Sequence, residues 1–168
     1  MKIILARHGA TEWNTDGRLM GRRDVVLSEL GREQAEALRQ KLAGVEFDCC
    51  FSSPLTRAKE TAEIVCDGRC EIFYDQNLME QYGGEFEGMV VNDWELYRNS
   101  ETVESGADIL SRAAAFLEMV KKQDYNCVLV VSHSGLLINL RHLILGRTGE
   151  INYGEWHLSN CEYAVFEI

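Results

Sequence analysis

The chain has 168 residues, 46% of them hydrophobic and 26% charged, which is the balance of a globular protein with its own core. No run reaches the roughly 20 apolar residues that span a bilayer, and the first residues lack the pattern of a secretory signal. The formal net charge of −10 argues against nucleic acid and anionic membrane as partners, because both select basic surfaces. We therefore expect a cytoplasmic protein, and the composition leaves its oligomeric state open.

Apolar runs of strand length alternate with apolar stripes at helical spacing. Ser28 is a plausible helix N-cap, and Ala35, Leu38 and Leu42 recur on one helical face before Gly44. In chain order, the expected elements are a strand at 2–6, a helix from Ser28, a strand at 47–51, a helix at 56–66, a strand at 71–74, a short helix at 90–98, a helix at 105–122, a strand at 127–131, a helix at 136–145 and an edge strand around Cys161, Tyr163 and Val165.

This alternation predicts an α/β fold, as a three-layer α/β/α sandwich with a mostly parallel central sheet. We expect one domain over residues 1–168, because no repeat, low-complexity segment or linker interrupts the sequence. Gly83, Gly84 and Gly88 break up residues 80–104, which we interpret as a short cap segment.

The six cysteines favour reduced thiols over a disulfide framework or a zinc site. Three of them lie in apolar, strand-like runs, where cysteine behaves as a small hydrophobe. Cys66 and Cys70 are the one pair with a motif-like spacing, and no second Cys or His pair lies at zinc-finger spacing. We therefore expect no structural metal.

Cationic side chains follow three of the predicted strands at the point where each strand ends. Arg7 and His8 follow the first strand, Arg57 lies in the first turn of the helix after the second strand, and His133 follows the strand at 127–131. The carboxyl ends of parallel strands meet at one edge of a sheet, where α/β proteins bind ligands. Any one of these residues could be a surface charge or a strand-end cap, but four equivalent positions favour a shared site.

Two guanidinium and two imidazole groups suit a dianionic phosphoryl group, because planar guanidinium forks match its oxygens. Gly9 and Gly135 lie where the backbone could approach such a ligand, and the helix beginning near Gly135 could direct N–H groups at it. A metal site is the weaker interpretation, since two adjacent arginines would repel a dication. His142 and His157 lack partners at a recognisable spacing and are interpreted as structural or surface residues. We predict no metal ligands and no cofactor.

These residues belong to blocks that carry a family pattern. Residues 7–14, RHGATEWN, resemble the signature of the histidine phosphatase superfamily, in its phosphoglycerate mutase-like branch. The similarity continues in the order of that family at residues 27–35, 52–58, 60–62, 80 with 83–88, and 132–135. One block alone would be weak evidence, whereas ordered blocks that cover most of the chain are strong evidence.

The resemblance implies a role for each candidate residue. His8 would be the nucleophile that takes the phosphoryl group as phosphohistidine. Glu80 matches the family's proton donor to the leaving oxygen, which later activates water; in isolation it could be a surface carboxylate of an acidic loop. This chemistry is coherent, because neutral imidazole is nucleophilic near pH 7 and fixed cations stabilise phosphoryl transfer. The implied phosphate-binding residues are Arg7, Asn14, Arg57 and His133, and His133 is also implied to be catalytic, because it would neutralise charge as the phosphoryl group moves.

The sequence departs from the family pattern near the expected leaving group. Phe86 stands where the family often has tryptophan, and it is expected to keep an aromatic wall of different shape. The order Glu104-Ser105-Gly106 differs from the usual Gly-Glu-Ser, which puts a ligand role for that segment in doubt. Ser134 places a hydroxyl beside His133 where glycine is common.

The short cap at 80–104 favours hydrolysis over transfer, since it would leave a phosphohistidine open to water. We expect a metal-independent phosphatase for a small phosphorylated metabolite, such as a sugar phosphate, phosphoserine or α-ribazole phosphate. Arg98 is the one basic residue of the cap, which argues against a second phosphate held there. The alternatives are a phosphoglycerate mutase-type transfer enzyme and a non-catalytic module that binds phosphorylated ligands.

Overall fold

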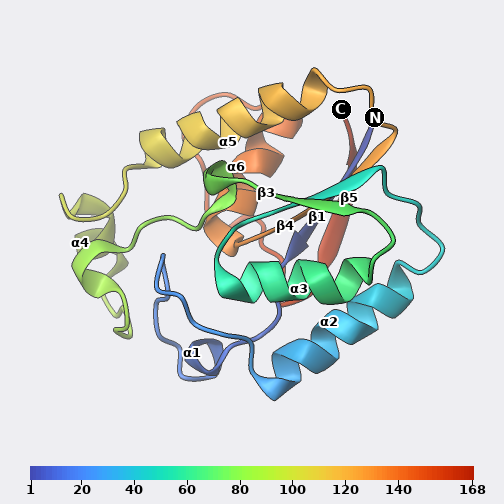
Figure 1. The fold of residues 1–168 in the computed structure, drawn as a ribbon. Helices are drawn as coiled ribbons and strands as arrows, with labels where there is room; N and C mark the ends of the chain where they lie inside the picture. The colour runs from blue at the N-terminus through green and yellow to red at the C-terminus, as the bar shows by residue number, and fades with distance from the viewer.

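The chain forms five strands, β1 (Lys2–Arg7), β2 (Cys49–Ser52), β3 (Glu71–Tyr74), β4 (Cys127–Ser132) and β5 (Tyr163–Glu167). In the computed structural model, which describes all 168 residues, they form one sheet in the order β3-β2-β4-β1-β5 (Figure 1). The first four strands run parallel, and β5 pairs antiparallel with β1 at one edge. The α/β class and the mostly parallel sheet are confirmed.

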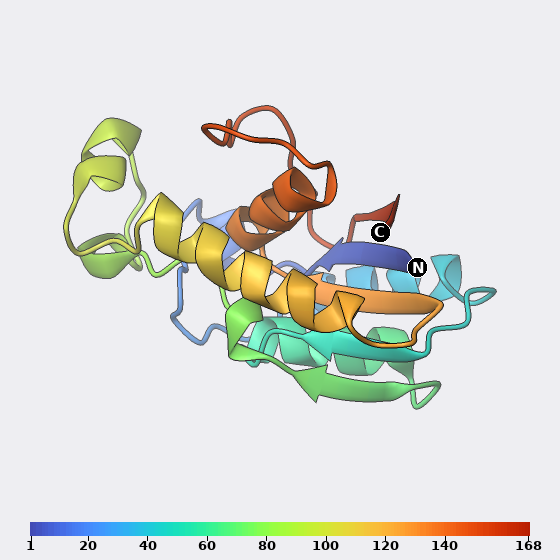
Figure 2. The ribbon, with the colours of Figure 1, turned by 90° about the horizontal axis from the view of Figure 1, so that it is seen from above.

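Helices cover both faces of this sheet. The helices are α1 (Glu12–Thr15), α2 (Glu29–Lys41), α3 (Thr56–Cys66), α4 (Trp94–Asn99), α5 (Gly106–Lys121) and α6 (Ser134–Ile144), with short 3-10 turns at Gln76–Leu78 and Gly84–Phe86. One face is covered by α2 and α3 and the other by α5 and α6, whereas α4 lies beyond the sheet (Figures 1 and 2). None of these helices is both long and apolar enough to cross a membrane.

The central strand β4 shows how the sequence produces these layers. All of its residues are buried, as expected for a parallel strand with helices on both faces. Its side chains alternate between two cores: Val128 and Val130 pack on the side of α5 and α6, whereas Leu129 and Val131 pack on the side of α2 and α3. A continuous apolar run therefore marks the strand whose end lies at the centre of the site.

Some predicted boundaries differ from the structure for local reasons. The cap helix begins at Trp94, later than predicted, because the Asp93 carboxylate accepts hydrogen bonds from the backbone N–H groups of residues 95 and 96. Cys161 precedes the last strand, in a left-handed conformation with φ of 55°. In β5 the half-buried side chains are Ala164 and Phe166, and the alternate positions Tyr163 and Val165 are exposed.

Two glycines fix the loop after β1 against the first turn of α2. A Cβ atom on Gly31 would lie 2.0 Å from the Ala10 carbonyl oxygen, and one on Gly9 would lie 2.4 Å from the Gly31 oxygen. Ser28, the N-cap of α2, donates to the same Ala10 oxygen from its backbone nitrogen and its hydroxyl, at 2.9 and 3.0 Å. Direct backbone contact therefore holds the loop that follows His8.

Replacing Gly31 by alanine should lower the free energy of unfolding by about 1–3 kcal/mol, because the added methyl meets backbone that cannot rotate away. The midpoint of urea unfolding measures this. Gly106→Ala is the matched control, because Gly106 also lies in a first helical turn and its Cβ would meet nothing within 4 Å. Alanine there should be neutral or mildly stabilising. Equal destabilisation by both substitutions would contradict the contact argument.

Candidate active site

The sheet brings the predicted cationic residues to one place. His8 follows β1, Arg57 lies in the first turn of α3, and His133 separates β4 from α6, where the His8 and His133 ring centroids are 5.1 Å apart. Beside them is a cavity of about 690 Å³, whose wall includes Arg7, His8, Asn14, Arg57 and Glu80. His133 is completely buried next to His8 and is not part of the cavity wall.

The surroundings of His8 define its protonation. Its side chain is 2% exposed, and Nδ1 lies 2.7 Å from the Gly9 carbonyl oxygen. Because a carbonyl only accepts hydrogen bonds, Nδ1 carries the proton and Nε2 keeps its lone pair. Burial, followed by the charges of Arg57 and Arg7, lowers the pKa of His8 well below its ordinary value, which outweighs the opposing Gly9 bond. The ring is therefore a neutral imidazole near pH 7.

His133 is held by a serine from the loop after β2. Its Nε2 lies 2.8 Å from the Ser53 hydroxyl oxygen, which also accepts the Leu55 N–H at 3.3 Å. Nε2 is the one acceptor within hydrogen-bond distance of the Ser53 hydroxyl proton, so we assign that proton to this bond and the imidazole proton of His133 to Nδ1. Burial, with the charge of Arg57 next, lowers the pKa of His133 well below its ordinary value and keeps it neutral.

The two arginines are fixed by backbone oxygens. The Nη atoms of Arg57 donate to Arg23 and Gly21 at 2.9 and 2.7 Å, and Arg7 donates to Leu158 at 2.9 Å. Burial lowers the pKa of Arg57 to about 10, against the opposite influence of Glu80, so the group stays charged near pH 7.

Three nitrogens in this cluster have no hydrogen-bond partner although they are buried: Nε of Arg7, Nε of Arg57 and Nδ1 of His133. Each buried unpaired donor costs about 1–3 kcal/mol. The three belong to the side chains that surround His8, so an anion with several acceptor oxygens is the ligand type that this cluster suits.

Asn14 presents one polar group to the cavity. Its Oδ1 accepts bonds from the Thr11 backbone N–H and hydroxyl at 3.0 and 3.2 Å, in a capping box. The Asn160 amide also lies 3.4 Å from this oxygen and donates to the His8 carbonyl at 2.9 Å. The side-chain NH₂ of Asn14 is thus the donor left to a ligand. Asn160 is a supporting residue that no pattern in the sequence indicates.

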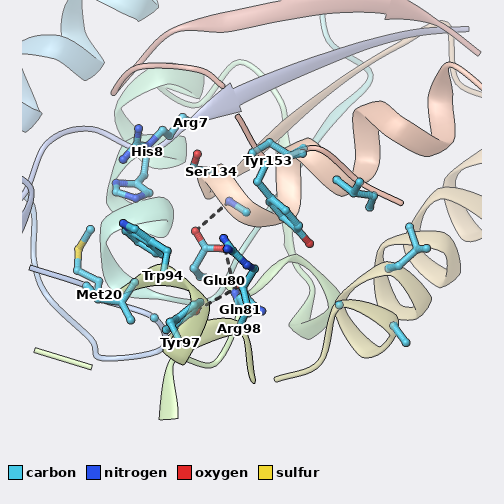
Figure 3. Close-up of a pocket in the computed structure, with 18 of the residues that line it drawn as sticks. Arg7, His8, Met20, Glu80, Gln81, Trp94, Tyr97, Arg98, Ser134 and Tyr153 are labelled. Carbon is cyan, nitrogen blue, oxygen red and sulfur yellow. Dashed lines mark hydrogen bonds between the residues drawn. The ribbon is translucent and has the colours of Figure 1, made fainter. Parts of the chain in front are cut away.

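Glu80 lies across the cavity, at the start of the cap segment. Its Oε2 accepts the Gly135 N–H at 3.2 Å, and its Oε1 accepts the Gln81 N–H at 2.9 Å (Figure 3). A Cβ on Gly135 would lie 2.7 Å from Oε1. We expected Gly9 and Gly135 to let a ligand approach the backbone. In the structure, the space beside Gly9 is occupied by Gly31 and the space beside Gly135 by the Glu80 carboxylate.

A buried ion-pair network positions the segment around Glu80. Glu104 pairs with Arg22 at 3.1 Å and Arg112 at 2.7 Å, with its side chain 10% exposed. Arg112 donates to the Met79 carbonyl, and Arg22 donates to the Glu80 carbonyl at 3.2 Å. Burial raises the pKa of Glu104, but the hydrogen bonds and the charge of Arg112 outweigh burial, so the pKa of Glu104 lies below its ordinary value. The neighbouring Ser105 caps α5.

The cap contributes the aromatic part of the wall, through Trp94 and Tyr97 on α4. The expectation that Phe86 lines the site is wrong. Phe86 packs edge-on against Tyr97, with centroids 5.4 Å apart, and does not reach the cavity wall. Tyr153, from the loop between α6 and β5, completes this wall (Figure 3) and was not predicted, because its segment has no periodic pattern.

Comparison with known proteins agrees with this geometry. Residues 3–168 match the family model of the histidine phosphatase superfamily (branch 1). Phosphoserine phosphatase 1 of Hydrogenobacter thermophilus is 35% identical over all of this chain and 85% of its own length. The 2-carboxy-D-arabinitol-1-phosphatase of Triticum aestivum is 31% identical, and the match spans 99% of this chain but 37% of that protein. The α-ribazole phosphatase structure from Shigella flexneri has a TM-score of 0.90 at 26% identity, covering 100% of this chain and 91% of its own.

The two depressed histidine pKa values predict acid sensitivity. Below about pH 6.5 the unfolded histidines bind protons that the folded ones do not, so stability falls as pH falls, by up to about 1.4 kcal/mol per pH unit for each residue. Urea unfolding between pH 7 and 5 measures this slope. His8→Ala should remove one residue's share of this slope. An unchanged slope in His8→Ala would contradict the buried, neutral state of His8.

Proposed function

The chain belongs to the histidine phosphatase superfamily, and we propose that it hydrolyses a phosphomonoester through a phosphohistidine formed on His8. Relatives named as phosphatases that match over most of their length support the reaction class. Those relatives are named for small phosphorylated compounds, which supports a small phosphorylated metabolite as the substrate. The observation that carries the proposal is the neutral, buried His8 with a free Nε2 beside three unpaired buried donors.

In the first step the lone pair of His8 Nε2 attacks phosphorus, and the bond from phosphorus to the leaving oxygen breaks. The Nδ1 proton stays on the ring, so the phosphorylated imidazole carries a positive charge that the Gly9 carbonyl stabilises at 2.7 Å. Arg7, Arg57 and the Nδ1–H of His133 offset the charge on the phosphoryl oxygens. The proton for the leaving oxygen comes from Glu80, in its protonated form.

In the second step the Glu80 carboxylate takes a proton from water, the oxygen of which attacks the phosphohistidine. The bond from phosphorus to Nε2 breaks, inorganic phosphate leaves, and His8 returns to the neutral Nδ1–H form. The short cap, in which α4 is a six-residue helix, supports access for water and hence hydrolysis over transfer to a second substrate.

Removing the nucleophile should abolish turnover and leave the anion pocket in place. His8→Ala is expected to lower kcat by about a thousandfold or more, while it keeps affinity for inorganic phosphate. Phosphate release and acid-quenched phosphohistidine measured with a ³²P-labelled ester test this. His157→Ala is the matched control because His157 is exposed. Full activity in His8→Ala would overturn the proposal, and phosphate binding without turnover in the wild type would indicate a binding module.

The role of Glu80 predicts a dependence on the leaving group. Glu80→Gln should lower phosphohistidine formation from an alkyl phosphate by about 10²–10⁴-fold, because an alkoxide needs a proton to leave. A p-nitrophenyl ester needs no such proton, so it should still give a burst of nitrophenol as phosphohistidine accumulates. Stopped-flow absorbance measures that burst.

Two further variants make this test specific. Gly135→Ala should give a weaker form of the same pattern, because its methyl would displace the Glu80 carboxylate from its position 2.7 Å away. Glu85→Gln is the control, since the Glu85 carboxylate bonds Ser100 and lies off the cavity wall. An equal loss with both esters in Glu80→Gln would exclude the role of general acid.

A further inference from the structure

The cavity is larger than a phosphoryl group and a short polar chain require. Its volume of about 690 Å³ lies in the range of sites that hold drug-sized ligands, roughly 300–1,000 Å³. Outside the proposed reaction centre, ring and alkyl side chains from several separate segments form much of the wall. Those on which the inference depends are Leu19, Trp94, Tyr97, Leu110, Ile138 and Tyr153.

The hydroxyl oxygens of the two tyrosines have hydrogen-bond partners within the protein. The Tyr97 hydroxyl donates to Gln81 Oε1 at 3.3 Å, and the Asn139 amide donates to the Tyr153 hydroxyl oxygen at 3.2 Å. The Gln81 amide in turn donates to the Glu104 carbonyl at 2.7 Å. These residues therefore offer a ligand the surfaces of their rings, and the donors left to it are the Trp94 indole N–H and the Tyr153 hydroxyl proton.

Two of these rings are uncovered, since Trp94 is 52% exposed and Tyr153 is 38% exposed. In Figure 3 they lie on either side of Glu80, the residue proposed to protonate the leaving oxygen. Exposed aromatic rings on the wall of one cavity gain most from a ligand that covers them with a ring of its own.

Outside the proposed reaction centre, the charged side chains of the cavity wall give a carboxylate no buried partner. Arg98 and Glu150 are both exposed and carry opposite signs, so solvent screens their interactions. The Arg18 guanidinium is held by the Gly88 carbonyl at 2.7 Å and stacks over the Trp13 ring at 4.2 Å. Small carboxylated esters, such as phosphoserine, would thus leave the aromatic wall uncovered and gain little from these cations.

We propose that the leaving group of the substrate is an uncharged alcohol that carries a planar, mostly apolar ring, bound between Trp94 and Tyr153. This inference rests on the proposed function. The ring belongs to the alcohol whose oxygen Glu80 protonates when His8 attacks phosphorus, so the reaction centre determines where the ring lies. It selects one class of phosphomonoester and makes Trp94 a determinant of specificity.

Phosphate esters of primary alcohols test the inference, because their leaving oxygens are chemically alike. We expect kcat/KM for 2-phenylethyl phosphate to exceed that for ethyl phosphate, phosphoserine and 3-phosphoglycerate by about tenfold or more. Trp94→Ala should lower the value for 2-phenylethyl phosphate by about tenfold and leave that for ethyl phosphate within about twofold. Leu96→Ala is the matched control, since Leu96 is on the same helix, 59% exposed and off the cavity wall.

The outcomes separate this inference from the proposed function. If every ester is hydrolysed through phosphohistidine but phosphoserine or 3-phosphoglycerate is preferred, the ring-bearing leaving group is wrong and the phosphatase proposal stands. An equal effect of Trp94→Ala on 2-phenylethyl and ethyl phosphate would also overturn the inference. If no ester yields phosphate or phosphohistidine, both proposals fail.

Discussion

A fully buried guanidinium group without a carboxylate partner determines the electrostatics of this site. Arg57 is buried at the wall of the cavity, and its Nη atoms donate to the backbone carbonyls of Gly21 and Arg23. Carbonyl dipoles fix the guanidinium but do not neutralise it, so its charge acts on the neighbouring rings. With burial as the larger cause, that charge lowers the pKa of His8 and of His133. The same arrangement therefore attracts an anion and keeps the nearby imidazole unprotonated, which are the two requirements of a nucleophilic histidine.

The loop that fixes Arg57 also connects the cationic cluster to the acid. Gly21 and Arg23 provide carbonyls for Arg57, while Arg22 between them donates to the Glu80 carbonyl and pairs with Glu104. Three consecutive residues thus set the positions of the cation proposed to bind phosphate and of the proposed proton donor, on opposite sides of the cavity. A displacement of this loop would move Arg57 and Glu80 together. The distance between these two side chains therefore depends on one short segment, residues 21–23.

The sequence predicted the parts of the site that depend on strands. Arg7, His8 and His133 directly follow apolar runs, and Arg57 lies in the first turn after one, so the parallel sheet alone brings them together. The supporting contacts were not predictable in this way. Asn160, Glu104 and Tyr153 lie in irregular segments, where no hydrophobic period indicates which atoms will meet. Phe86 was misplaced for the same reason, since position in a sequence block does not show whether a ring faces the cavity or packs behind Tyr97. The tight contacts of Gly31 and Gly135 likewise depend on which backbone and side-chain atoms fold against them.

The residues at the strand ends and those in the irregular segments differ in burial, and they are proposed to act on different parts of the substrate. The groups proposed to act on phosphorus are fixed to the ends of β1 and β4 and the start of α3, within the most buried part of the protein. The groups proposed to surround the leaving alcohol come from α4 and from the loop before β5, and several of them are exposed. Exposed positions tolerate substitution with little cost in stability, whereas a change at a buried charge or ring affects the fold itself. On the proposed function, substitutions at Trp94 or Tyr153 should change substrate preference without disturbing the protonation of His8, because neither Arg57 and Arg7, whose charges help to keep it neutral, nor the Gly9 carbonyl, which fixes its tautomer, belongs to the cap.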